Sequence, residues 1–195
     1  MRPRLAAARK NEPLVFVMVK EPRPGKVKTR LGKDIGMLAA AQWYKRHAAR
    51  LCHRLVDARW SLVAAYDPKM SRIIPNNTQL QVWQGTGDLG RRMIRMLRLA
   101  PAKSILIGSD ILGLEKHHIA RAVAALGTYD AVLGPSPDGG YWLIGFRHPE
   151  RIPLGLLDGV RWSSEHAMAD TLTRLPGRVA LVDQLNDADT IDDLR

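Results

Sequence analysis

A continuous apolar run of strand length, Leu14–Val19, leads directly into a basic loop that also contains glycine and proline. Within the next eleven positions fall five cationic side chains: Lys20, Arg23, Lys26, Lys28 and Arg30. A loop at the carboxyl end of a strand can present backbone N–H groups to an anion, and Lys and Arg offset its charge. The pattern favours a site for a phosphate-rich ligand, with a solvated surface loop as the alternative.

Strand and helix patterns alternate along the rest of the chain. Further strands are predicted over 60–66, 80–83, 104–107, 131–134, 141–146 and 179–182. Helices are predicted over roughly 35–58, 89–99, 119–126 and 163–175. Alternating strands and helices imply a mostly parallel sheet with helices on both faces. We therefore predict an α/β fold, a three-layer αβα sandwich around about seven strands.

Length and composition fit one globular domain. The chain has 195 residues, 46% of them hydrophobic, which is ordinary for a protein with a single core. We predict one domain over 13–195, preceded by a flexible basic tail over 1–12. No stretch approaches the roughly 20 apolar residues of a membrane helix. A lone Cys52 excludes an internal disulfide and a cysteine-based zinc cluster, and it fits a reducing cytoplasm.

Positive charge is concentrated at one end of the chain. Residues 1–50 hold thirteen Lys or Arg and three acids, whereas residues 51–195 hold seventeen and sixteen. A basic arm of this kind also occurs in nucleic-acid-binding modules. Five of the charges lie in the short loop beside proline and glycine, so a folded anion site explains their placement better. Nucleic acid is therefore the least favoured partner.

A glycine-rich segment, Gly85-Thr-Gly-Asp-Leu-Gly90, follows the predicted strand 80–83. It has the G-x-G-x-x-G form of a dinucleotide-binding loop. However, it follows the third strand and leaves the basic loop after the first strand without a role. The alternative is a glycine-rich turn in which Asp88 caps the next helix.

Several carboxylates follow predicted strands. Asp110 ends a strand in Gly108-Ser109-Asp110, and Asp187 and Asp189 alternate in the acidic tail. Alternate residues of an extended segment point the same way, so both could complete a Mg²⁺ or Mn²⁺ site begun by Asp110. The alternatives are a turn for Asp110 and a helix cap for the tail. Asp138, before Gly139 and Gly140, could accept a proton or bind a hydroxyl, or form a hairpin turn.

Five ordered motifs resemble one known family. They are Lys20–Leu31, Gln84–Met93, Ile107–Asp110, Leu133–Gly145 and Asp187–Leu194. Together they are similar to the DUF2064 family of the GT-A glycosyltransferase-like superfamily of nucleotide-diphospho-sugar transferases. The family is similar to the 2-phospholactate guanylyltransferases and the molybdenum-cofactor nucleotidylyltransferases. The resemblance spans nearly the whole chain after residue 13 and implies a GT-A, Rossmann-like sandwich.

The resemblance also implies roles for residues at the matching positions. The residues implied to bind nucleotide or phosphate are Gly25, Lys28, Thr29, Arg30, Gln84, Gly85 and Asp88. Those implied to line the sugar or acceptor pocket are Asp138, Gly139, Gly140 and Tyr141. Asp110 matches the metal-binding aspartate of the superfamily, and Asp189 or Asp187 a second one.

The expected activity is transfer of a sugar from a nucleotide-activated donor to an unidentified acceptor. A Mg²⁺ or Mn²⁺ at Asp110 would stabilise the leaving diphosphate, and Asp138 would orient or deprotonate the acceptor hydroxyl. The same residues would serve a nucleotidylyltransferase. The family commonly has proline where this chain has Lys33 and Leu112, and Leu112 lies two residues after the expected metal ligand. This departure motivates a third alternative, a non-catalytic nucleotide-binding protein.

Overall fold

The computed structural model describes residues 11–69 and 80–194 and contains one seven-stranded sheet. The strands are β1 (Leu14–Lys20), β2 (Ser61–Asp67), β3 (Leu80–Trp83), β4 (Ser104–Gly108), β5 (Ala131–Pro135), β6 (Tyr141–Phe146) and β7 (Val179–Leu181). Their order across the sheet is β3-β2-β1-β4-β6-β5-β7. Only β6 among them runs antiparallel to its neighbours, so the predicted mostly parallel sheet is confirmed.

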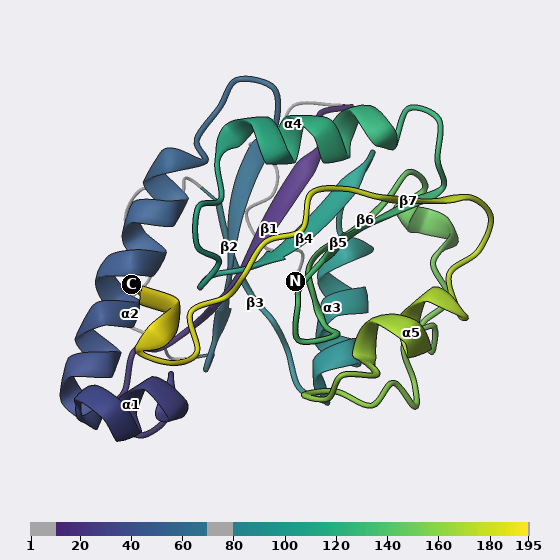
Figure 1. Cartoon of the computed structure of the whole chain (residues 1–195). Helices are drawn as coiled ribbons and strands as arrows, with labels where there is room; N and C mark the ends of the chain where they lie inside the picture. Colours follow the sequence, from purple (N-terminus) through teal and green to yellow (C-terminus); the bar gives the residue numbers. More distant parts are fainter. Residues whose placement is uncertain (1–10, 70–79, 195) are drawn as a thin grey trace.

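Helices cover both faces of the sheet (Figure 1). On one face lie α2 (Met37–Arg54) and α4 (Lys116–Ala125), packed on Val15 and Val17 of β1. On the other face lie α3 (Leu89–Leu97) and α5 (Ala167–Leu172), in the same cluster as Leu14 and Phe16. Because β1 is buried on both sides, its sequence is a continuous apolar run. Each such buried side chain stabilises the fold by about 1.5–3 kcal/mol.

Two of the predicted helices have different bounds in the structure. The helix expected over 35–58 is α2, and α1 (Thr29–Ile35), which was not predicted, precedes it; Gly36 at φ 89° lies between them. Glycine adopts this conformation without steric strain, so it separates them. The helix expected over 163–175 is limited to α5, since Ser163 at φ 58° and successive turns occupy the residues before it.

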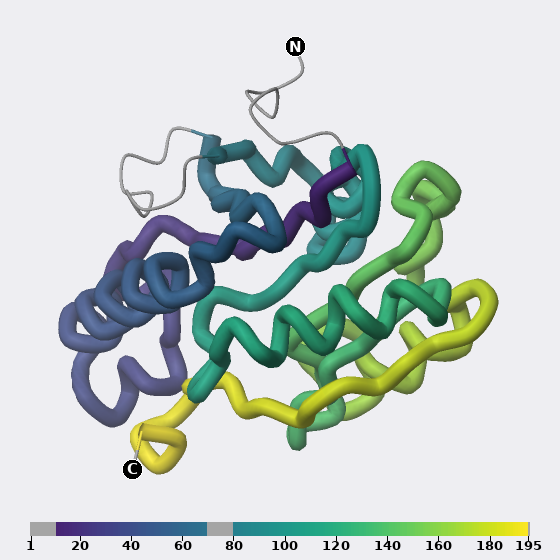
Figure 2. Tube along the Cα trace, turned by 90° about the horizontal axis from the view of Figure 1, so that it is seen from above, coloured from purple at the N-terminus to yellow at the C-terminus, as the bar shows by residue number. Residues whose placement is uncertain are grey.

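The C-terminal segment crosses the molecule after β7. It passes the carboxyl end of β4 and reaches α1, where Asp34 accepts a hydrogen bond from the Ile191 backbone N–H (Figure 2). The short 3₁₀ helices are η2 (Pro149–Arg151) and η3 (Asp192–Leu194). Of the basic tail predicted over 1–12, residues 1–10 lie outside the described residues. Glu12 accepts a hydrogen bond from the Ser61 hydroxyl.

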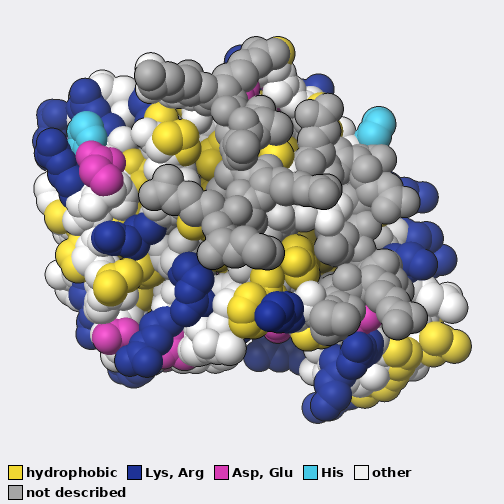
Figure 3. All heavy atoms as spheres, turned by 180° about the vertical axis from the view of Figure 1, so that it is seen from behind, with side chains coloured by type: hydrophobic (Ala, Val, Ile, Leu, Met, Phe, Trp, Pro, Cys, Tyr) yellow, Lys and Arg dark blue, Asp and Glu magenta, His cyan; other side chains and the backbone are white. Residues whose placement is uncertain are grey.

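Lys and Arg side chains are distributed widely over the described surface. Viewed from behind, they lie at both sides and along the lower edge of the molecule (Figure 3). None of the helices in the described residues has the length and hydropathy that a membrane-spanning segment needs.

Candidate functional site

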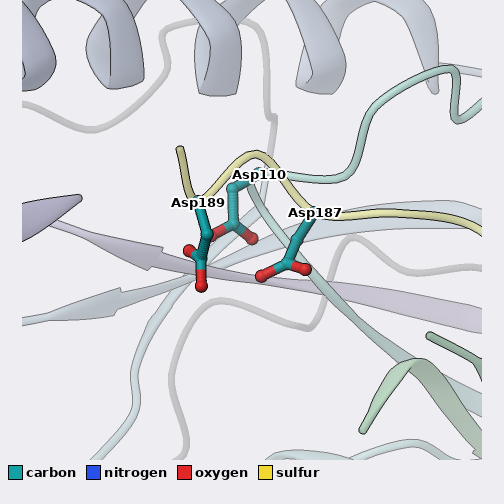
Figure 4. Close-up of side chains that lie close together, drawn as sticks. All are labelled: Asp110, Asp187 and Asp189. Carbon is teal, nitrogen blue, oxygen red and sulfur yellow. The ribbon is translucent and has the colours of Figure 1, made fainter. Parts of the chain in front are cut away.

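Three carboxylates meet at the carboxyl edge of the sheet. Asp110 follows β4, whereas Asp187 and Asp189 belong to the C-terminal segment (Figure 4). One oxygen from each lies within 4.8 Å of the others, and the three carboxylates point toward one another. Residues nearly eighty positions apart in the sequence therefore form one acidic cluster.

Backbone pairing holds the cluster together. Ile111 and Asp187 form an antiparallel bridge, and the Ala188 N–H donates to the Asp110 carbonyl at 3.1 Å. Ala188 is fully buried. Because successive residues of an extended segment face opposite ways, burial of Ala188 directs Asp187 and Asp189 toward Asp110.

Leu112 contributes directly to this arrangement. Its backbone N–H donates to the Asn186 carbonyl at 2.8 Å. A proline, the residue common at this position in the resembling family, has no N–H and could not make this bond. The departure therefore supplies a hydrogen bond that attaches the acidic tail beside Asp110.

The basic loop after β1 brings cations to the same place. Val27 is buried against α2, and Lys28 adopts a left-handed conformation, φ 45°, as α1 begins. The Lys28 ammonium contacts Asp110, donates to Asp189 at 2.9 Å and lies 4.0 Å from Asp187. The exposed Arg30 donates to the second Asp189 oxygen at 2.7 Å.

Burial and crowding perturb the ionisation of this cluster. Burial lowers the pKa of the Lys28 ammonium, but the adjacent Asp110 and Asp189 outweigh it and leave the pKa raised. Burial, together with the charge of Asp189, raises the pKa of Asp187 to about 6. The cluster thus keeps Lys28 protonated, whereas ionisation of Asp187 within it costs free energy.

Tyr44 of α2 supports the site from behind. Its hydroxyl accepts a hydrogen bond from the Lys20 backbone N–H at 3.0 Å and pairs with the Ser109 hydroxyl at 2.7 Å. Burial raises the pKa of Tyr44 to about 12, so the phenol stays neutral. Tyr44 lies within the helix predicted over 35–58, and no motif in the sequence indicates its polar contact with the strand ends.

Two cavities adjoin at the cluster. A polar cavity of about 500 Å³ is lined by Lys20, Lys26, Lys28, Thr29 and Arg30 on one side. A second cavity of about 230 Å³ is lined mainly by apolar side chains of the sheet, α3 and the segment before α5. Asp110 and Asp187 line both cavities, so the acidic cluster stands between them.

The turn between β5 and β6 reaches the second cavity. Asp138, Gly140 and Tyr141 line it. Asp138 is exposed and accepts a hydrogen bond from the Gly140 N–H at 2.9 Å, so it also closes the hairpin turn considered above. Gly139, at φ 81°, packs against the Glu165 backbone so closely that a Cβ would clash with it.

Four of the candidate nucleotide-binding residues lie outside both cavities: Gly25, Gln84, Gly85 and Asp88. Gln84 is 1% exposed, and its amide N–H groups donate to the carbonyls of Val19 and Ala65. Asp88 accepts from the Arg91 N–H and caps α3. The glycine-rich segment therefore serves as a capped turn that connects β3 to α3.

Leu89 and Trp162 extend the candidate site beyond the residues named from the sequence. Leu89 is 36% exposed and lines both cavities, because the first turn of α3 faces the cleft. Trp162 and Ser163 lie on turns that the sequence assigned in part to a helix. No local motif marks these turn residues as cavity walls.

The fold and this cleft are those of α/β proteins that resemble nucleotide-diphospho-sugar transferases. The model of the DUF2064 family, described as "Uncharacterized protein conserved in bacteria", matches residues 46–164. The match covers more than half of the chain, so the chain belongs to this family and the predicted resemblance to it is confirmed. Three of the five motifs lie within the matched residues: Gln84–Met93, Ile107–Asp110 and Leu133–Gly145.

Solved structures show the same fold. A candidate nucleotide-diphospho-sugar transferase from Desulfovibrio desulfuricans G20 is 31% identical, with a TM-score of 0.84 over 94% of this chain and 85% of its own. A CMP:2-keto-3-deoxy-manno-octonic acid synthetase complexed with CTP is 10% identical, with a TM-score of 0.57 over 94% and 95% of the two chains.

A third structure, 4-diphosphocytidyl-2C-methyl-D-erythritol synthase from Anaerococcus prevotii DSM 20548, is 9% identical. Its TM-score is 0.55 over 95% of this chain and 96% of its own. The comparison with curated proteins finds no match. The two distant structures show the shared fold, and the structure that is 31% identical supports a transferase function in general terms.

Proposed function

We propose that this chain transfers a sugar from a nucleotide-activated donor, with a divalent cation held by Asp110, Asp187 and Asp189. The observation that carries the proposal is the meeting of these carboxylates with Lys28 and Arg30 in one cleft. Hard cations take carboxylate and phosphate oxygens together, and cationic side chains offset the remaining phosphate charge. The 31% identity to a candidate nucleotide-diphospho-sugar transferase supports the same class of donor.

The residues present fit a Mg²⁺ or Mn²⁺ ion. Three carboxylate oxygens within 4.8 Å of one another are the donors that such ions prefer. The Lys28 ammonium already lies among them as a positive stand-in. A divalent ion there would act as a Lewis acid toward a bound diphosphate.

The chain's own residues would divide the remaining work. Lys28 and Arg30, with Lys26 in the same cavity, would bind the diphosphate and offset the charge that it gains on leaving. Asp138, on the turn at the other cavity, would orient the acceptor hydroxyl and accept its proton. Tyr44 and Ser109 would keep the end of β4 in place.

Nucleotidyl transfer is the second candidate. It differs in the atom attacked, the α-phosphorus in place of the sugar carbon, and it releases pyrophosphate. The specific observation in its favour is the number of cations in the polar cavity, where Lys26, Lys28 and Arg30 would suit a triphosphate. Two structures of the same fold carry the names of cytidylyl-transferring synthetases, and one holds CTP.

The first experiment is a thermal-shift screen of nucleotides and nucleotide sugars with and without Mn²⁺. A ligand that binds the folded state raises the melting temperature, so a positive result identifies the base and the metal requirement. The positive donor is then assayed for its products. A nucleoside diphosphate indicates glycosyl transfer, and pyrophosphate indicates nucleotidyl transfer.

The matched variants are Asp110→Asn in the cluster and Asp158→Asn on the surface. A catalyst loses its metal-dependent rate in the first and keeps it in the second. If Asp110→Asn lowers affinity while no donor turns over in the unaltered chain, a non-catalytic binder is indicated. Salt-sensitive binding of oligonucleotides without nucleotide binding would instead indicate a nucleic-acid-binding module and refute the proposal.

A further inference from the structure

The second cavity of the cleft has walls unlike those of the first. Its apolar lining comes from the sheet, α3 and the turn before α5: Met18, Met93, Leu106, Tyr141, Ile144 and Trp162. The Tyr141 and Trp162 rings meet edge to face, with centroids 6.3 Å apart. We call this space the apolar chamber. At about 230 Å³ it lies near the lower limit of small-molecule sites, which suits one ring or a short branched chain.

Polar atoms in the chamber walls are largely occupied by other protein groups. The Trp142 indole N–H donates to the Asp183 carbonyl at 2.9 Å, and the Tyr141 hydroxyl accepts from Thr171 at 3.3 Å. The Ser164 hydroxyl donates to the Arg161 carbonyl at 2.6 Å. Polar groups of an occupant that face these atoms, and not one of the carboxylates that also line the chamber, would be left unpaired.

Two hydroxyls in the wall, those of Ser136 and Ser163, have no hydrogen-bond partner among the described residues. Ser136 is 9% exposed. It can accept or donate one hydrogen bond. The chamber therefore offers a ligand a few polar contacts, from these hydroxyls and the carboxylates, within an apolar surface.

Charge separates the two cavities. The residues that line the apolar chamber include Asp110, Asp138 and Asp187 and no Lys or Arg. The polar cavity shares Asp110 and Asp187, but four Lys or Arg side chains line it as well. A phosphate or carboxylate would be repelled in the apolar chamber, whereas a neutral molecule would not.

The geometry points to the apolar chamber as the acceptor site, and to a neutral alcohol with an aromatic or branched aliphatic body as the acceptor. This inference rests on the proposed glycosyl transfer. The alcohol oxygen bonds to the anomeric carbon of the sugar, and the bond from that carbon to the diphosphate oxygen breaks. The electron pair leaves with the diphosphate, and the alcohol proton passes to the Asp138 carboxylate.

The test is ligand-observed NMR on the full chain with three probes of one shape. They are 4-methylbenzyl alcohol, 4-methylbenzoate and 4-methylphenyl phosphate, each titrated without nucleotide. The alcohol should bind at least about tenfold more tightly than either anion. Asp138→Asn removes one of the repelling charges, so it should reduce the difference in affinity between the alcohol and the benzoate.

Three variants locate the binding. Ala167→Leu places extra carbon in the chamber from α5, and Trp162→Leu removes one aromatic wall. Each should weaken alcohol binding several-fold, and the first keeps the test valid if the second fails to fold. Trp83→Leu is the matched control, because Trp83 belongs to β3 and lines neither cavity.

The outcomes separate this inference from the proposed function. Equal binding of the anions, or competition of cytidine or guanosine with the alcohol, would overturn the inference. If the chain binds nucleotide and Mn²⁺ but none of the three probes, the inference is also overturned, and the proposed function remains intact. Alcohol binding by a chain that takes neither nucleotide nor metal would refute the proposed function and, with it, the acceptor role.

Discussion

Replacing Asp187 by Asn should stabilise the protein at neutral pH when no metal is present, although it removes a proposed metal ligand. Burial, with the charge of Asp189, raises the pKa of Asp187 from 3.8 to about 6 in the folded chain. The folded chain therefore binds more protons than the unfolded chain between about pH 4 and pH 6. The free energy of unfolding falls as the pH rises through this window, and above about pH 6 the full loss of stability remains.

The size of the gain follows from the shift. Two pKa units correspond to about 3 kcal/mol, which is an upper bound. The Asp187 side chain is 32% exposed, so solvent screening reduces the expected gain to about 1–2 kcal/mol. For a chain of this length, that gain raises the melting temperature by about 2–8 °C.

The assay is calorimetry in EDTA at pH 7.5 and pH 4.5, with Asp158→Asn as the control. The Asp187→Asn variant should melt higher than the unaltered chain at pH 7.5 and show little difference at pH 4.5, where Asp187 is mostly protonated. Mn²⁺ should then stabilise the unaltered chain more than the variant. If the melting temperature of Asp187→Asn rises equally at both pH values, or falls at pH 7.5, the electrostatic account of the cluster is refuted.

Three further variants test the cleft. By titration calorimetry, the Lys28→Met variant should bind Mn²⁺ several-fold more tightly than the unaltered chain when no nucleotide is present, and it should bind a nucleoside diphosphate more weakly. If both affinities rise or both fall, this prediction is contradicted. Leu112→Pro loses the hydrogen bond to Asn186, about 1 kcal/mol, and should weaken Mn²⁺ binding, whereas Leu112→Ala keeps the N–H and the affinity. In urea unfolding, Gly25→Ala should lower the free energy of unfolding by about 1–2 kcal/mol through its positive φ alone. Gly139→Ala should lower it clearly more, because a Cβ there also meets the Glu165 backbone.

Local patterns predicted most of the fold. The strand over 80–83 has the predicted bounds, and Asp88 caps α3, as one of the two interpretations of its segment proposed. Both depend on neighbouring residues, so the sequence carries them directly. The helix α1 was missed, and the predicted bounds of α2 and α5 were wrong near Gly36 and Ser163, where a positive φ interrupts the helical pattern.

The candidate site was less predictable, because it depends on contacts between distant segments. Asp110, Asp187 and Asp189 were each a plausible ligand, but their meeting requires the bridge between Ile111 and Asp187. The apolar chamber depends on how the turns before α5 pack on the hairpin of Asp138. Neither contact has a periodic or motif signal, so the sequence predicted the residue types and not the two-cavity arrangement.

The charges of the cluster suggest an order in which ligands enter. Within the cluster, three carboxylates face Lys28 and Arg30, which leaves the cluster itself net negative. Before a metal binds, Lys20 and Lys26 of the same cavity are the cations that remain for a diphosphate. A divalent ion would reverse the sign and compete with Lys28 for the same oxygens. The ammonium would then be available to phosphate, so each ligand would favour the other's binding, as linkage requires. On this account Lys28 keeps the acidic cluster folded until the metal replaces it, and the raised pKa of Asp187 reflects the incomplete neutralisation that remains.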